Sequence, residues 1–229
     1  KKLSRPWLVG AVAAVLALIV LTVWVRRDSG PEELNLTEFE SKLDAGEAIP
    51  RFDAASAKLR RATRWELVAV PGLIPDLTFF AHLANRRFPV TDWLRTPAEF
   101  DYIVEPDVFH DLFGHVPLLF NPVFADYMQA YGAGGLKASR LDACELLARL
   151  YWYTVEFGLI ETKAGLRAYG AGILSSAAEV KHAIEGESVE RLPFDAATAM
   201  QRPYEIDKLQ PTYFVLDDFR QLLDRPAAH

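Results

Sequence analysis

Apolar residues recur at helical spacing along much of the chain. The clearest example runs from Ser139 to Thr162, where apolar positions repeat every three or four residues and Gly165 follows just beyond. This pattern predicts the best-defined helix of the protein. Three further helices are predicted from capping and apolar residues: "DAASAKLRRATR" capped by Asp53, "PDLTFFAHLAN" with Pro75 in its first turn, and a segment opened by Ser175 or Ser176.

Short strands are predicted between these helices. "WELVAV" precedes Pro71-Gly72, a pair typical of turns, and predicts one strand. "RRFPV" predicts a second, and "LRAYGAG" predicts a brief strand or a turn. The C-terminal "PTYFVLDDFRQLL" is amphipathic. The predicted fold is therefore mainly α with minor β.

An apolar segment near the N-terminus departs from this pattern. Trp7 to Val25 is 19 residues without a charge, long enough to span a hydrocarbon core of roughly 30 Å. Arg26-Arg27 follows it, and we predict one N-terminal transmembrane helix. A cleaved signal peptide is the competing interpretation, but it would be shorter and end at a small-residue site. The predicted domains are residues 1–30, the membrane helix and a linker, and residues 31–229, the folded domain.

The composition is that of a globular protein with one core. The chain has 229 residues, of which 51% are hydrophobic and 24% charged, and its net charge is −6. Lysine and arginine form no stripe that would neutralise phosphates, so we expect no nucleic-acid partner. Cys144 is the only cysteine, which excludes an internal disulfide.

Two histidines in "PDVFHDLFGHVPLLF" are the first candidates for chemistry. His110 and His115 are five residues apart, and on an unbroken α-helix the second ring would point about 140° away from the first. A shared metal therefore requires the helix to change course between them. Gly114 and Pro117 permit this through a left-handed turn and a helix stop. Two histidines with ordinary hydrogen bonds in a helix-loop corner are the alternative.

A carboxylate strengthens the case for a metal. Glu156 lies in "YWYTVEFG", an aromatic and apolar run where a buried carboxylate needs a cation, a metal or hydrogen bonds to stay ionised. Two imidazoles and one carboxylate are the ligand set of non-haem Fe(II) oxygenases. A zinc hydrolase could use the same ligand types, but its usual His-Glu-x-x-His spacing is not found here.

Three separated blocks of sequence resemble one family. "EPDVFHDLFGHVPLLFNPVFADYMQAYG", "YWYTVEFGLIETKAGLRAYGAGILSSAAEV" and "YEIDKLQPTYFVLDDF" together are similar to the pterin-dependent aromatic amino acid hydroxylases, of bacterial phenylalanine hydroxylase type. The likeness runs from Ile49 to Leu223, so we expect an N-terminally truncated catalytic fold of this family behind the membrane helix. It implies Fe(II) held by His110, His115 and Glu156 as catalytic ligands, with a tetrahydrobiopterin-like reduced pterin as electron donor.

The resemblance also implies positions for the pterin and the substrate. Phe79 matches the family's pterin-stacking phenylalanine, and Asp111 resembles the acidic residue near the pterin. Arg95 matches the arginine that takes the substrate carboxylate, to which a guanidinium fork binds bidentately. Without the resemblance, Phe79 would be interpreted as core and Arg95 as a surface charge.

Three more residues are placed at the substrate pocket. Trp152 and Phe157 fit an aromatic pocket. Ser175, grouped with them, resembles the hydroxyl that orients a ligand histidine. Tryptophan hydroxylases tend to carry phenylalanine where Trp152 stands, so the resemblance favours phenylalanine as the substrate.

The implied activity is a monooxygenase reaction of phenylalanine catabolism, which hydroxylates phenylalanine to tyrosine with Fe(II), dioxygen and reduced pterin. The alternatives are a membrane-tethered truncated homologue that keeps an iron site without efficient catalysis, or a tryptophan-type hydroxylase. We expect a monomer, attached to the membrane through its N-terminal helix. Because Fe(II) and reduced pterin suit a reducing compartment, the catalytic domain is predicted on the cytoplasmic side; a soluble cytoplasmic protein is the alternative.

Overall fold

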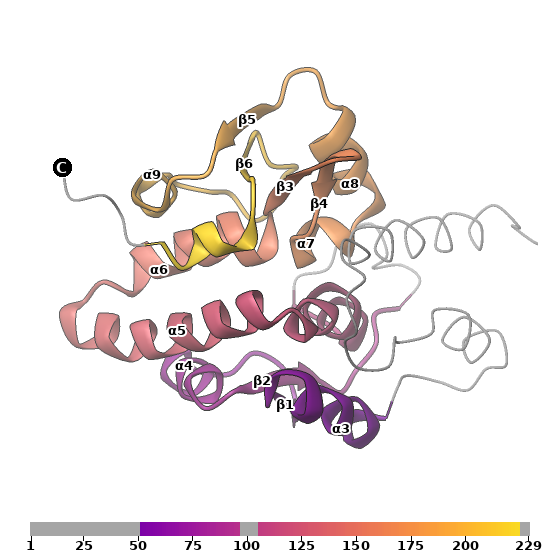
Figure 1. The fold of residues 1–229 in the computed structure, drawn as a ribbon, viewed down its shortest axis with the longest axis vertical. Helices are drawn as coiled ribbons and strands as arrows, with labels where there is room; N and C mark the ends of the chain where they lie inside the picture. Colours follow the sequence, from indigo (N-terminus) through magenta and orange to yellow (C-terminus); the bar gives the residue numbers. More distant parts are fainter. Residues whose placement is uncertain (1–50, 97–104, 225–229) are drawn as a thin grey trace, which may run out of the picture. The chain divides into compact units, whose positions relative to one another are not determined.

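The computed structural model describes residues 51–96 and 105–224, which fall within one compact unit (Figure 1). Its α-helices are α3 (Phe52–Thr63), α4 (Asp76–Ala84), α5 (Pro122–Ala138), α6 (Cys144–Tyr151), α7 (Ala171–Leu174), α8 (Ala177–Glu185) and α9 (Ala196–Gln201). Its strands are β1 (Glu66–Val70), β2 (Arg87–Thr91), β3 (Leu159–Thr162), β4 (Gly165–Ala168), β5 (Glu190–Pro193) and β6 (Thr212–Leu216). The other described helical segments are the π-helices η2 (His110–His115) and η5 (Trp152–Glu156), and the 3₁₀ turns η3 (Val116–Phe120), η4 (Ser139–Leu141) and η6 (Phe219–Leu222).

Helix α5 runs through the middle of this unit, packed against α4 on one side and α6 on the other (Figure 1). Its start is fixed by Asn121, whose side chain accepts two backbone N–H hydrogen bonds, and by Pro122 in the first turn. Close packing with α4 requires a glycine: a Cβ on Gly132 would lie 2.4 Å from the backbone nitrogen of Ala84. The helix therefore serves as the common support for the elements on both sides.

Two sheets flank the helices. In the smaller sheet β1 and β2 pair in parallel. The larger sheet has the order β4-β3-β6-β5, with β3 antiparallel to β4 and parallel to β6, and β5 parallel to β6. Tyr213 and Phe214 of β6 are almost completely buried. Because β3 begins at Leu159, shortly after Glu156, the larger sheet holds the end of η5 in place.

The main core lies around α5 and is rich in aromatic side chains. The buried aromatic residues of this cluster come from α4, α5, β2 and the segments before β1 and after β4, and they are Trp65, Phe80, Phe88, Phe124, Tyr127, Tyr131 and Tyr169. Large aromatic side chains bury much apolar surface for few conformational degrees of freedom. Aromatic packing of this kind gives the neighbouring helices fixed positions.

The helix-rich fold with small sheets agrees with the prediction, but the helix predicted over 139–162 is wrong in extent. The chain forms a 3₁₀ turn, takes a left-handed conformation at Asp142 (φ 53°), and only then enters α6 and η5. The helical segment ends at Glu156, and two residues later a Cβ on Gly158 would lie 2.1 Å from the Tyr169 ring. Residues 159–162 form β3 instead, because they pair with β4 and β6.

The capping of the first helix differs from the expectation. The C-terminal segment, for which the pattern indicates only amphipathicity, forms strand β6 and the short turn η6. Asp53 lies in the first turn of α3 and does not cap it, since Arg51 occupies the N-cap position. The strands predicted at "WELVAV" and "RRFPV" are confirmed as β1 and β2.

Within residues 51–96 and 105–224, no helix combines the length and apolarity needed to cross a membrane. The predicted membrane segment Trp7–Val25 and the predicted domain boundary at residue 30 lie outside these described residues.

Candidate metal centre

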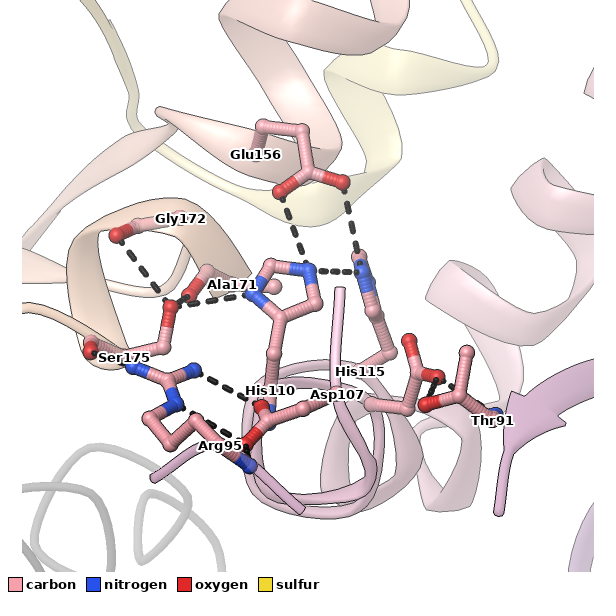
Figure 2. A network of polar contacts seen from close by, with 10 residues as sticks. Thr91, Arg95, Asp107, His110, His115, Glu156, Ala171, Gly172 and Ser175 are labelled. Carbon is pink, nitrogen blue, oxygen red and sulfur yellow. Dashed lines mark hydrogen bonds and ion pairs between the residues drawn. The ribbon is translucent and has the colours of Figure 1, made fainter. Parts of the chain in front are cut away.

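The two histidines meet because the helix between them is a π-helix. In η2 the backbone N–H of Val116 donates to the carbonyl of Asp111, five residues back. This wider turn brings the Nε2 atoms of His110 and His115 to 3.0 Å (Figure 2). The helix does change course between them, as predicted, but it widens instead of ending.

Gly114 has a different role from the predicted left-handed turn. Among the described glycines, only Gly72 and Gly165 have positive φ angles. A Cβ on Gly114 would lie 2.6 Å from the Cβ of Ala171, so the missing side chain lets α7 pack directly against η2. This close contact brings Ser175, just after α7, to the histidine pair.

The third donor comes from the second π-helix. The backbone N–H of Phe157 donates to the carbonyl of Trp152 at 2.8 Å, which closes η5. The last residue of η5 is Glu156, whose carboxylate oxygens lie 3.2 Å from His115 Nε2 and 3.5 Å from His110 Nε2 (Figure 2). All three donor groups have atoms within 4.8 Å of one another. The arrangement can hold one metal ion.

Ser175 fixes which nitrogen of His110 carries the proton. The serine hydroxyl donates to the carbonyl of Ala171 at 2.8 Å, so its oxygen is left to accept a hydrogen bond from His110 Nδ1 at 2.9 Å (Figure 2). With the proton on Nδ1, the Nε2 lone pair of His110 faces His115 and Glu156. This is the tautomer that a metal requires.

Burial and mutual charge set the protonation of the three groups. Burial lowers the pKa of His110, and the Glu156 carboxylate offsets this only in part. Burial also opposes protonation of His115, but the charge of Glu156 and its hydrogen bond outweigh it and raise the pKa of His115. For Glu156, burial favours the neutral form, yet the two histidines hold its pKa below the usual value. An ionised carboxylate is available as a ligand.

Arg95 is buried, with its side chain only 3% exposed, and it is not a surface charge. Its guanidinium forms a bidentate ion pair with Asp107, with both contacts at 2.8 Å. Asp107 also accepts the backbone N–H of His110 at 2.9 Å, which ties the arginine to the first histidine (Figure 2). Nη1 of Arg95 reaches the Ser175 carbonyl at 3.4 Å, a weak contact that leaves donor capacity for a ligand.

The two residues predicted at the pterin are held by different contacts. Asp111 is buried, and its Oδ2 accepts the backbone N–H and the hydroxyl of Thr91 at 2.8 and 2.9 Å. Phe79 stands edge-on to Tyr151, with ring centroids 5.8 Å apart, and the Tyr151 ring lies 6.3 Å from that of His115. Burial raises the pKa of Tyr151 well above its usual value, so its hydroxyl stays neutral.

Trp152 and Phe157, predicted to line a substrate pocket, do lie against each other. Their ring centroids are 4.5 Å apart. Tyr204 stacks on Trp152 with centroids 4.2 Å apart and an interplanar angle of 14°. A Cβ on Gly172 would lie 2.8 Å from the Phe157 ring, which fixes that ring against α7. Trp152, Phe157 and Tyr204 thus form a set of three packed rings, called here the aromatic wall.

Sequence reasoning did not single out Asp107, Tyr151 or Tyr204. A signal for Asp107 was present, because an aspartate three residues before His110 can accept the backbone N–H of that residue as a cap does. Tyr151 adjoins Trp152 in the same aromatic run and could have been included with it. Tyr204 is distant in sequence, and only the fold brings it to the site.

The comparisons with known proteins agree with this geometry. A sequence profile described as biopterin-dependent aromatic amino acid hydroxylase matches residues 33–227. The chain belongs to this family. Phenylalanine-4-hydroxylases of Ralstonia nicotianae and Chromobacterium violaceum are each 62% identical to it over 78% of this chain. A crystal structure of the C. violaceum enzyme, described as iron and phenylalanine bound, matches this chain with a TM-score of 0.76 and 51% identity, over 96% of this chain and 78% of that one.

These comparisons confirm the resemblance and correct one prediction. The chain spans 57% and 60% of the length of the two bacterial relatives. The membrane-anchored location predicted from the sequence is contradicted: the match to a phenylalanine hydroxylase structure extends over 96% of the chain, and no described helix could cross a membrane. Length and apolarity make a segment a candidate for a membrane span, and they do not by themselves establish one.

Proposed function

We propose that this hydroxylase converts phenylalanine to tyrosine with iron, dioxygen and a reduced pterin. The observation that carries the proposal is the convergence of His110, His115 and Glu156 in a chain 51% identical to an enzyme whose structure is described as iron and phenylalanine bound. Zinc accepts the same donors. The iron in that relative favours iron here.

The donor set fits Fe(II) in both charge and protonation. Ser175 leaves Nε2 of His110 unprotonated, and Glu156 supplies an anionic oxygen. When bound, iron would activate dioxygen, with two electrons from the reduced pterin, so that one oxygen atom enters the aromatic ring. Because two of the three donors sit on one π-helix and the third on another, their spacing is set by the backbone before a metal arrives.

Arg95 would bind the carboxylate of the amino acid substrate. Its ion pair with Asp107 uses one edge of the guanidinium and holds the group rigid, while Nη1 keeps a donor for the ligand. A preorganised donor of this kind orients the substrate without a further entropy cost. The backbone link from Asp107 to His110 places this carboxylate site at a fixed distance from the metal ligands.

The aromatic residues would bind the two planar molecules. Trp152 and Phe157 would contact the ring of the substrate, and Phe79 would offer its face to the pterin. Asp111, held by Thr91, would accept a hydrogen bond from a polar edge of the pterin. Closely packed rings also exclude water from the reacting atoms.

The test is tyrosine formation from phenylalanine by the purified chain supplied with Fe(II), air and tetrahydrobiopterin. We expect tyrosine with matching consumption of the pterin, and none from the Glu156→Gln variant. Tryptophan is assayed in parallel, and a larger yield of hydroxytryptophan than of tyrosine would favour the tryptophan-type alternative. A wild-type chain that binds iron and forms neither product would refute the proposal.

A further inference from the structure

A single amide fixes the Trp152 ring. The indole Nε1–H donates to Oε1 of Gln210 at 3.0 Å, and Gln210 is only 1% exposed. The side-chain NH₂ of Gln210 donates to two backbone carbonyls, those of Glu205 at 2.7 Å and Lys208 at 2.8 Å. These two acceptors decide which end of the amide is nitrogen, so the oxygen must face the indole.

The backbone N–H and carbonyl of Gln210 are also hydrogen-bonded. Its N–H donates to the buried carboxylate of Glu179 at 3.1 Å, and its carbonyl is bonded to Nε2 of His182 at 3.1 Å. Glu179 is itself held by the hydroxyl of Tyr213. Every polar group of Gln210 is therefore in use. A fully satisfied buried network of this kind specifies one arrangement of its members.

The same residue joins two parts of the aromatic wall. Residues 204–210 form the loop whose carbonyls Gln210 binds, and this loop carries Tyr204, which stacks on Trp152. Trp152 also opens η5, the π-helix that ends at Glu156. One amide thus fixes the indole through its N–H, and the stacked tyrosine through the loop.

We propose that Gln210 is a positioning residue that sets the preference of the hydroxylase for a single-ring amino acid, by holding the indole of Trp152 in one orientation. This inference rests on the proposed hydroxylation. Without Oε1 of Gln210, the indole N–H would be left unpaired in a partly buried place, or the ring would turn to find another acceptor. Either outcome changes the surface that the substrate ring meets. Because leaving a buried donor unpaired is costly, we expect the loss of Oε1 to raise the KM for phenylalanine about tenfold.

The kinetic experiment compares Gln210→Met, Trp152→Phe and the double variant. Methionine has the length of glutamine but no donor and only a weak acceptor, and phenylalanine in place of Trp152 removes the indole N–H. We expect Gln210→Met to raise the KM for phenylalanine about tenfold with a smaller change in kcat, and to reduce the kcat/KM ratio of phenylalanine to tryptophan. When Trp152→Phe is already present, adding Gln210→Met should not alter the kcat/KM ratio of phenylalanine to tryptophan.

The matched control is Gln129→Met. Gln129 also donates to a backbone carbonyl, that of Ala84 at 3.1 Å. This bond lies between α5 and α4, away from the loop of residues 204–210. It loses a hydrogen bond of the same type without touching Trp152. We expect this variant to keep the KM for phenylalanine and the preference for it, and iron content should be unchanged in every variant.

A second measurement tests the positioning without turnover. The Trp152 indole N–H resonance is assigned by its loss in Trp152→Phe, and its exchange with solvent is measured by NMR. We expect exchange at least tenfold faster in Gln210→Met than in the wild type or in Gln129→Met, because the protecting bond is gone. If Gln210→Met does not fold, Gln210→Glu replaces it: this variant loses the two bonds to the loop carbonyls but keeps an acceptor for the indole. Because the proposal assigns the effect to the indole bond, exchange should stay slow and the preference for phenylalanine should be kept.

The outcomes separate the two proposals. A wild-type chain that forms no tyrosine would refute the proposed function, while the exchange measurement would still decide whether Gln210 positions Trp152. Unchanged exchange in Gln210→Met would overturn the inference. So would an equal loss of preference in the Trp152→Phe background, or a loss of preference in Gln210→Glu despite its acceptor, since each would assign the effect to the loop and not to the indole.

Discussion

Asp107 accepts hydrogen bonds on both of its carboxylate oxygens. Oδ2 receives the backbone N–H and Nε of Arg95, and Oδ1 receives Nη2 of Arg95 and the backbone N–H of His110. Complete burial would favour the neutral acid, but the guanidinium and the two N–H groups outweigh it and hold the pKa of Asp107 below its usual value. A single residue thus holds Arg95 and His110 in fixed positions relative to each other.

Replacing this aspartate tests that link. Asp107→Asn leaves a buried guanidinium without its counter-charge, so we expect a loss of about 3–5 kcal/mol in the free energy of unfolding, measured with urea at neutral pH. The loss should shrink as the pH falls below about 4. The pKa of Asp107 is lower in the folded than in the unfolded protein, so its ionised form stabilises the fold fully only at pH values above the unfolded pKa. This contribution disappears as the carboxylate becomes protonated in the folded protein. Asp53→Asn removes an exposed ion pair with Arg51 and is the control, with no measurable change expected. A loss for Asp107→Asn that stayed constant down to pH 2 would contradict the ionised pair.

Ser175 offers a second prediction at the scale of one side chain. Ser175→Ala removes the acceptor for His110 Nδ1, so the ring is free to rotate or to change tautomer. We expect the affinity for Fe(II) or Co(II) to fall about 10- to 100-fold, as is usual when the hydrogen-bond partner of a ligand histidine is removed. Titration calorimetry under anaerobic conditions gives the affinity. Ser139→Ala, which removes a hydroxyl bonded only to a helix carbonyl, should bind metal like the wild type, and equal affinity in both variants would show that Ser175 does not orient the ligand.

At the scale of elements, the two π-helices are the features that local sequence pattern could not provide. The spacing of His110 and His115 showed that a regular α-helix would not bring the rings together. The structure solves this with the π-helix η2, against which α7 packs at Gly114, and neither feature is visible in the local pattern. The predicted helix over 139–162 failed for a similar reason. Its apolar spacing is helical, yet residues 159–162 form a hairpin with β4, and Leu159 and Ile160 also pair with β6, which lies about 50 residues further along the chain.

The contact between α4 and α5 gives a prediction for an element pair. Gly132→Ala would place a Cβ 2.4 Å from the backbone nitrogen of Ala84, and because backbone cannot yield as a flexible side chain can, we expect a loss of at least about 1–3 kcal/mol in unfolding free energy. Gly134→Ala on the same helix meets nothing closer than 4.0 Å and should instead stabilise by about 0.5–1 kcal/mol through the lower entropy of the unfolded chain. Urea unfolding of the pair decides the matter. Equal effects from the two substitutions would contradict the close packing of α4 on α5.

At the scale of the whole molecule, the sequence predicts the fold and the family but not the contacts between its segments. The helix-rich fold and the identity of the family follow from motif blocks of the chain itself. The partners of the site residues do not, because they are set by contacts between distant segments: Arg95 with Asp107 across residues 96–106, and Trp152 with Gln210 across 58 positions. No periodicity marks such pairs in advance. The roles of the individual site residues stay predictions, which the variants above address.

The metal itself should join these distant parts of the molecule. Its donors come from η2 and η5, which are separated in the chain by all of α5 and α6, so a bound ion bridges two segments that the unfolded chain does not hold together. A ligand that binds only the folded state raises stability with its concentration, by about 2.7 kcal/mol at a hundredfold excess over Kd. We therefore expect Fe(II), or Co(II) in air, to raise the midpoint of thermal unfolding in a concentration-dependent manner. Chelator should reverse the shift, and Glu156→Gln should lose most of it.

The control for this experiment is His82→Ala, which removes a histidine of α4 that is not part of the cluster of His110, His115 and Glu156. It should keep the full metal-dependent shift, which would exclude metal bound at His82 as its cause. A shift of the same size in Glu156→Gln as in the wild type would mean that the ion binds elsewhere. In that case the hydrogen bonds of Ser175 and Asp107 would have to be explained as parts of the fold alone, with no metal for them to orient.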